Sequence, residues 1–185
     1  SYVGELGFEL YIKMNESKEI FNLITEKGKE FNLSLCGMLA MDTMRMESGY
    51  LHWGHDISPE ENQYEAGLKF AISYKKEVNF IGKESLLKIK DKKKIKKLAM
   101  FVLKNSKPGN PLMLHDEPIY LDNKIIGRTT SANYSFNFNK NLAFGYINFE
   151  EDLELLKDKK LYIEIEKKKY EAEILLKPLN SKNIK

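Results

Sequence analysis

The sequence predicts an α+β fold, in which a partly helical segment is followed by a small antiparallel β domain. Three features support this prediction: apolar residues at helical spacing before residue 90, a lysine-rich run at residues 88–97, and short apolar segments separated by turn residues after that run. Because the pattern changes at the lysine run, we expect two units, residues 1–90 and residues 95–180. The sequence contains no internal repeat.

The first unit is expected to contain three helices and two strands. Apolar residues at helical spacing indicate the helices, and Gly49 follows the second of them, where a glycine commonly ends a helix. Asn15 and Ser17 offer capping side chains before the first helix. The expected helices are residues 18–31, 38–47 and 82–89, and the expected strands are residues 8–12 and 66–74.

The second unit is expected to contain six short strands and little helix. Asp122-Asn123 and Lys167-Lys168 mark tight connections between consecutive strands. Six short strands joined by turns favour a small antiparallel barrel or sandwich. The expected strands are residues 98–103, 118–121, 124–127, 142–147, 161–166 and 170–176.

The composition is that of an ordinary globular protein. Of 185 residues, 42% are hydrophobic and 31% are charged, which excludes a disordered chain. No apolar run reaches the length needed to cross a bilayer, so we expect no membrane association. Cys36 is the single cysteine and cannot form an internal disulfide, which predicts a reducing compartment and a cytoplasmic location. Because the chain begins at Ser1, close to an expected strand, we also expect a truncated domain.

The net charge of +3 is concentrated in the lysine run at residues 88–97. A basic run can bind nucleic acid through phosphate contacts. Aromatic residues that would stack on bases do not interleave these lysines, so we interpret the run as a solvated linker and predict no nucleic-acid partner. An RNA-associated protein is the alternative that this run leaves open.

Several short motifs together resemble one enzyme family. In this order and with these gaps, they resemble the second half of the glycine cleavage T-protein (aminomethyltransferase) family, including its carboxy-terminal barrel. The resemblance extends from residue 1 to about residue 180. The motifs are YVGELGFEL at 2–10, DTMRMESGY at 42–50, WGHDI at 53–57, EAGL at 65–68, FIGKE at 80–84, GRTTS at 127–131 and LAFGY at 142–146.

This resemblance implies a tetrahydrofolate site. In the family, a carboxylate binds the amino group and the ring N–H along one edge of the pterin, and two parallel hydrogen bonds fix its orientation. The resemblance assigns this carboxylate to Glu9 and places Tyr2 beside the pterin. Glu5 competes for the same role. Seven positions separate Tyr2 from Glu9, so an unbroken strand would put them on opposite faces, unless Gly4 and Gly7 bend it.

Other polar and aromatic residues have two interpretations each. Trp53 can stack on a ligand ring or simply pack, and the Thr130 hydroxyl, with its neighbours Thr129 and Ser131, can face the folate or hold a turn. Arg45 and Glu47 are expected to form structural ion pairs.

The three histidines do not suggest a metal site. His52 and His55 are close in sequence, but His115 lies in the other predicted unit, and a zinc site needs three or four ligands that converge. We therefore predict no metal. Cys36 has no histidine near it in sequence and is not expected to be a nucleophile.

Details within the family favour its demethylating branch. Aminomethyltransferases usually have an arginine before the aspartate of the second motif, where this chain has Met41. The chain therefore resembles most the folate-binding tail domain of sarcosine and dimethylglycine dehydrogenases. The implied function is the transfer of an N-methyl-derived carbon to tetrahydrofolate. FAD is expected only in an amino-terminal domain absent here, and we assign no catalytic residue because the family's acid–base aspartate has no counterpart in this sequence.

Two alternatives remain. The first is an aminomethyltransferase of the glycine cleavage system, and the second is a noncatalytic regulatory or binding module of the same fold. Either way, we expect the missing amino-terminal half of the same protein to be a partner. Without it, an exposed interdomain face is expected to drive self-association, which light scattering would detect.

Overall fold

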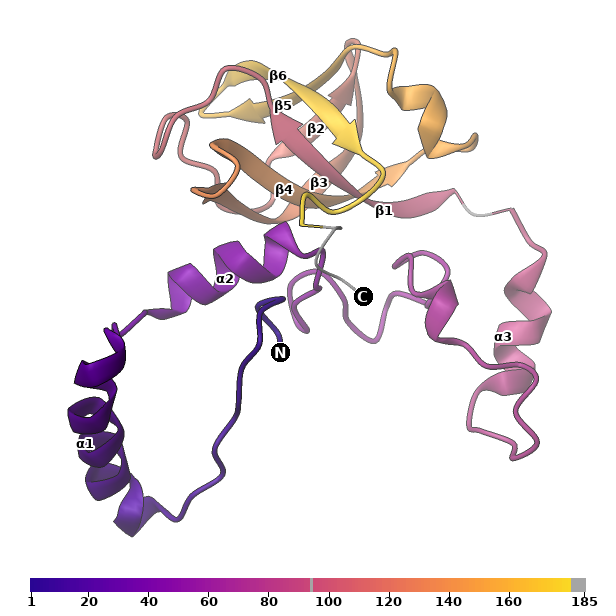
Figure 1. Cartoon of the computed structure of the whole chain (residues 1–185). Helices are drawn as coiled ribbons and strands as arrows, with labels where there is room; N and C mark the ends of the chain where they lie inside the picture. The colour runs from indigo at the N-terminus through magenta and orange to yellow at the C-terminus, as the bar shows by residue number, and fades with distance from the viewer. Residues whose placement is uncertain (94, 181–185) are drawn as a thin grey trace.

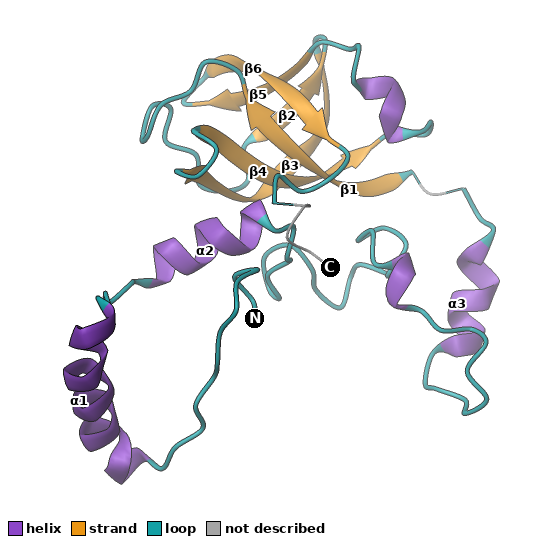
Figure 2. Ribbon diagram, in the orientation of Figure 1, coloured by secondary structure: helices purple, strands orange, loops and turns teal. Residues whose placement is uncertain are grey.

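The computed structural model describes residues 1–93 and 95–180, and it places a β-barrel beside an extended amino-terminal half (Figures 1 and 2). The helices are α1 (Ser17–Gly28), α2 (Met38–Glu47) and α3 (Lys83–Lys90). Short 3-10 turns are η1 (Met14–Glu16), η2 (Lys29–Phe31), η3 (Lys69–Ala71) and η4 (Leu153–Leu156). The strands are β1 (Lys96–Leu103), β2 (Pro118–Leu121), β3 (Lys124–Ser135), β4 (Lys140–Asn148), β5 (Leu161–Ile165) and β6 (Lys168–Leu175).

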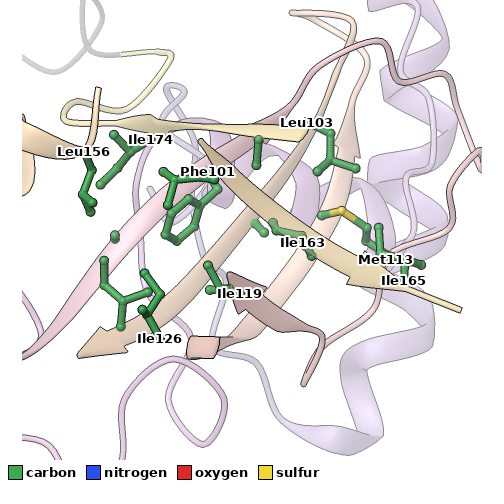
Figure 3. Packing of buried hydrophobic residues seen from close by; sticks show 14 residues of the cluster. Phe101, Leu103, Met113, Ile119, Ile126, Leu156, Ile163, Ile165 and Ile174 are labelled. Carbon is green, nitrogen blue, oxygen red and sulfur yellow. The ribbon is translucent and has the colours of Figure 1, made fainter. Parts of the chain in front are cut away.

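The six strands form a closed antiparallel barrel in the order β1-β4-β3-β2-β5-β6. Alternate residues of each strand point inward, so the barrel encloses an apolar core that includes Phe101, Ile119 and Ile163 (Figure 3). Closure leaves no free sheet edge. The α+β prediction, with a small antiparallel barrel at its carboxy-terminal end, is therefore confirmed.

Two strands of the barrel approach each other closely at Gly127. A Cβ atom at this position would lie 2.8 Å from the Cα of Ile147 and closer still to the carbonyl oxygen of Tyr146. Both neighbours are backbone atoms of the paired strand β4, so they cannot move aside without disturbing the ladder. Only glycine fits here.

Gly127→Ala is therefore expected to lower the free energy of unfolding by at least about 1–3 kcal/mol, the usual cost of overpacking. Gly37→Ala is the matched control, because its Cβ would meet nothing within 4 Å. Chemical denaturation of both variants checks this. Equal stability of the two variants would contradict the close approach.

Helix α2 packs on the outside of the barrel. Met46 joins Met100, Leu142 and Phe144 in a second apolar cluster between the helix and strands β1 and β4. The helix ends as predicted at Gly49, whose φ of 78° is left-handed, and the N–H of Tyr50 donates to the carbonyl of Arg45. This packing carries the polar residues of the second motif to the barrel surface.

Both strands predicted in the first unit are wrong. Residues 8–12 are extended but pair with no strand, and residues 66–74 form turns around η3. Apolar alternation alone does not make a strand when no neighbour supplies hydrogen bonds. The predicted cap is also wrong: Glu16 is the N-cap of α1 and makes no side-chain cap, while the Ser17 hydroxyl donates to the carbonyl of Met14.

The amino-terminal arm, residues 1–37, carries many exposed apolar side chains. It runs away from the barrel to α1, which stands apart from it (Figure 1). Leu6, Phe8 and Met14 are each about nine-tenths exposed. So much exposed apolar surface typically marks an interface, and self-association through this surface remains a prediction. Among the residues that the structure describes, no helix has the length and apolar character to cross a membrane.

The lysine run at residues 88–97 begins in the last turn of α3 and reaches the first residues of β1, and Lys94 is outside the described residues. Lys93 pairs with Glu150 at 2.6 Å and Lys96 pairs with Glu61 at 2.7 Å. The Lys97 ammonium donates to the carbonyl of Glu151. Part of the basic charge is thus paired with acidic groups, which lowers the attraction of this segment for phosphate. The absence of a nucleic-acid partner remains a prediction.

Candidate functional site

Tyr2 lines a cavity of about 710 Å³ between the barrel exterior and the segment after α2. Its hydroxyl donates a hydrogen bond to the carbonyl of Leu51 at 3.0 Å, and its ring stacks on Tyr50 with centroids 6.3 Å apart. Burial raises the pKa of the Tyr2 phenol, so the group stays a neutral donor. The cavity is lined mostly by apolar side chains and falls in the size range of ligand pockets.

Glu9 is exposed on the extended arm. One of its carboxylate oxygens accepts a hydrogen bond from the Tyr11 hydroxyl at 2.9 Å. The arm departs from straight extension at Gly4, which has a φ of 75°. The structure therefore places Glu9 and Tyr2 on one arm but in different surroundings, and the role of Glu9 as pterin anchor stays a prediction.

Trp53 lies in the loop that follows α2, here called the anchor loop, residues 50–57. The indole is 66% exposed. The loop closes on itself, because the N–H of Gly54 donates to the carbonyl of Ile57 at 2.8 Å and Gly54 adopts a φ of 90°. An exposed indole on a closed loop is available for stacking, so its ligand role also stays a prediction.

The Thr130 hydroxyl donates to Asp56 of the anchor loop at 2.5 Å. Its neighbours have other partners: the Ser131 hydroxyl accepts from Arg45 at 2.8 Å, and the Thr129 hydroxyl donates to Glu117. The three hydroxyls of this motif thus hold loops and α2 against strand β3. Contact between Thr130 and a ligand is a prediction that these hydrogen bonds do not test.

Arg45 is the centre of a buried polar network. Its side chain is 1% exposed, and its guanidinium bonds Asp42 at 2.7 Å and Asp56 at 2.6 Å. It also donates to the carbonyl of Tyr50 at 3.0 Å. Two carboxylates and a carbonyl compensate the buried charge, as burial of a cation requires. The predicted structural role of Arg45 in ion pairing is confirmed.

Glu47, also on α2, bonds the end of strand β3 and the turn that follows it. One carboxylate oxygen accepts from the Ser135 hydroxyl at 2.5 Å and the other from the Asn137 amide at 2.8 Å. Its role is structural, but the predicted ion pair of Glu47 is wrong, because both of its side-chain partners are neutral. A second cavity, of about 470 Å³, lies beside these residues and is also lined by Leu39 and Tyr134.

The structure brings all three histidines together, contrary to the separation predicted from sequence. The rings of His52 and His55 lie 4.6 Å apart, and those of His55 and His115 lie 6.4 Å apart. Folding of the anchor loop onto the barrel causes this approach. Within residues 1–93 and 95–180, no group of three or more His, Cys, Asp or Glu side chains is arranged to hold a metal.

The sequence interpretation missed the role of Asp56. This residue is fully buried, and its place in the WGHDI motif did not indicate a structural role. One feature of the sequence could have indicated this role: Asp56 lies in a motif that follows Arg45, and a buried arginine needs a carboxylate partner. Sequence alone does not reveal which carboxylate that is.

Two family models match the chain in order. The GCVT N-terminal domain matches residues 1–76, and the glycine cleavage T-protein C-terminal barrel domain matches residues 96–180. The chain belongs to the glycine cleavage T-protein family. The β-barrel of this T-protein family member is thus the domain that the second family model describes.

Curated relatives of this T-protein family member include enzymes of both branches. The chain is 33% identical over 184 residues to human mitochondrial dimethylglycine dehydrogenase, covering 97% of this chain and 20% of that protein. It is 35% identical over 146 residues to an aminomethyltransferase of Symbiobacterium thermophilum, covering 79% of this chain and 38% of that protein. The chain therefore spans between a fifth and two fifths of these relatives.

A solved structure has the same fold. Aminomethyltransferase T of the glycine cleavage system from Bartonella henselae superposes with a TM-score of 0.72 at 20% identity, covering 88% of this chain and 44% of that one. At this identity the similarity establishes the fold alone. It supports the arrangement of the barrel and the helical half as a T-protein-like structure.

Proposed function

We propose that this chain is the tetrahydrofolate-binding carboxy-terminal part of a one-carbon enzyme of the sarcosine and dimethylglycine dehydrogenase type. In this function an N-methyl-derived carbon passes to tetrahydrofolate. The observation that carries the proposal is the match to dimethylglycine dehydrogenase over 97% of the chain. The motif containing Tyr2 and Glu9 lies within residues 1–76, which match the GCVT N-terminal domain.

The residues present fit a folate in part. The cavity beside Tyr2 and Tyr50 offers aromatic surface and an apolar wall, as a pterin or aminobenzoate ring requires. The exposed Glu9 carboxylate would accept hydrogen bonds from the amino group and the ring N–H of the pterin. Tetrahydrofolate supplies a pair of nitrogens that accept the one-carbon unit.

The chain's own contribution is binding rather than proton transfer. Glu9 orients the ligand, Trp53 and Tyr2 provide ring contacts, and the apolar cavity wall limits water near a reactive carbon. No described residue is assigned as acid, base or nucleophile. Flavin chemistry, where the whole protein has it, belongs to sequence outside these residues.

The exposed arm suggests how the pocket becomes complete. Glu9 and the apolar residues around it face solvent in the described structure, so a high-affinity pocket needs further protein surface. We propose that the amino-terminal half of the same fold covers this arm. The cytoplasmic location stays a prediction, and the human relative is named as mitochondrial.

Calorimetric titration of the chain with tetrahydrofolate under reducing conditions tests the proposal. Weak but saturable binding is expected, because the pterin anchor is present while the pocket is open. A tetrahydropterin without the glutamate tail should compete, whereas p-aminobenzoylglutamate should compete poorly. Absence of saturable binding at millimolar ligand, or competition only by p-aminobenzoylglutamate, would overturn the proposed pterin anchor.

An aminomethyltransferase of the glycine cleavage system is the second candidate. The 35% identity to such an enzyme favours it, and Met41 on α2, in place of the arginine usual in that branch, opposes it. Met41→Arg separates the two: tighter folate binding by this variant would indicate that the site follows the aminomethyltransferase pattern.

A further inference from the structure

A buried carboxylate of the anchor loop, that of Asp56, joins the loop to strand β3 by a hydrogen bond. Asp56 accepts hydrogen bonds from three directions, and its side chain is fully buried. One oxygen accepts from Thr130 of strand β3 at 2.5 Å. The other accepts from Arg45 of α2 at 2.6 Å and from the backbone N–H of His52 at 2.9 Å. A carboxylate so bonded fixes its loop more firmly than one neutral hydrogen bond does.

The same loop holds the residues at the proposed ligand site. The carbonyl of Leu51, next to the bonded N–H of His52, accepts the hydrogen bond from the Tyr2 hydroxyl at 3.0 Å. Trp53 follows directly. A continuous path of contacts therefore runs from the barrel, through Thr130 and Asp56, to Tyr2 on the arm.

We propose that Thr130 and Asp56 are positioning residues, through which the barrel holds Trp53 and Tyr2 in place for the ligand. The effect on ligand binding rests on the proposed folate function, but the effect on the loop does not. Gly54 gives the anchor loop conformational freedom. Apart from that of His52, the bonded backbone N–H groups of the loop donate to carbonyls within the loop or at the end of α2. Without the bond from Thr130, the loop loses its side-chain hydrogen bond to strand β3 and keeps its bonds to α2 and the packing of Leu51 against the cluster on β1 and β4.

The sequence supplies a direct probe of this loop. Trp53 is the only tryptophan, so tryptophan fluorescence anisotropy reports the mobility of the anchor loop together with the tumbling of the whole chain. Thr130→Val keeps the side-chain shape and removes the hydroxyl, Thr130→Ser restores it, and Ser131→Ala removes a neighbouring hydroxyl that bonds Arg45 rather than the loop.

We expect Thr130→Val to lower the anisotropy of Trp53 and to weaken tetrahydrofolate binding about tenfold, as loss of a hydrogen bond to a charged group does. Thr130→Ser should restore both, and Ser131→Ala should leave the anisotropy unchanged. Thr130→Ala, which adds no methyl group, replaces the valine variant if that variant unfolds by circular dichroism.

The two measurements separate the two claims. Equal anisotropy in the parent, Thr130→Val and Thr130→Ala would overturn the positioning role. A fall in anisotropy in a chain that does not bind tetrahydrofolate would support the positioning role and count against the folate function. A fall in Ser131→Ala as large as in Thr130→Val would overturn the specific path through Thr130, because the loop would then depend on the network in general.

Discussion

Arg45→Ala is expected to lower the free energy of unfolding by about 3–5 kcal/mol, the usual result of breaking a buried ion pair from one side. The variant leaves Asp56 without its cationic partner in a fully buried site and removes the bond to Ser131 that joins α2 to the barrel. Burial of an uncompensated carboxylate is the main cost.

Arg128→Ala is the matched control, measured with Arg45→Ala by urea denaturation. Arg128 pairs with Asp116 at 3.2 Å, but both side chains are exposed, and such pairs contribute only about 0–1 kcal/mol. Similar losses in the two variants would show that the buried network does not stabilise the joint between α2 and the barrel.

Phe101→Ala is expected to cost about 3–5 kcal/mol, because it removes a large side chain from the middle of the barrel. Phe101 is fully buried on β1 among residues from the other strands (Figure 3). The barrel is closed, so its wall relaxes poorly around the resulting cavity.

The control is Phe31→Ala, the same substitution at a residue that is 81% exposed. It should change stability by less than about 0.5 kcal/mol, as most surface substitutions do. Thermal denaturation followed by circular dichroism of the barrel distinguishes the two. A loss at Phe31 that equals the loss at Phe101 would mean that the arm is packed in solution, for example in an oligomer.

The barrel could be predicted from sequence because the residues that specify each strand and turn lie within or next to that element. Strand β2 has the bounds expected from its pattern, and helix α2 likewise, since the periodicity and turn residues of each lie within the element. The prediction of a strand at residues 8–12 was wrong because a strand also needs a partner, and none of the described strands lies beside this segment. That another part of the fold covers its apolar side chains stays a proposal.

The hydrogen bonds that join α2 and the anchor loop to the barrel could be predicted only in part. The structural role of Arg45 followed from its place in a helix, but its partner Asp56 did not, because the fold decides which carboxylate it meets. Thr130 lies 74 positions from Asp56, and no periodicity links them. The approach of His115 to His55 escaped prediction for the same reason: it depends on how the anchor loop lies on the barrel.

We propose that this chain carries the pterin anchor of a folate enzyme at Glu9. The most direct measurement compares tetrahydrofolate affinity in the parent, Glu9→Gln and Glu5→Gln by calorimetry. Both substitutions change an exposed carboxylate of the same motif to an amide of equal size. The amide places a donor opposite the donors of the pterin, so Glu9→Gln should lose at least about 1–3 kcal/mol of binding free energy, and Glu5→Gln should lose little. Equal affinity in the parent and Glu9→Gln, or a loss confined to Glu5→Gln, would contradict the claim.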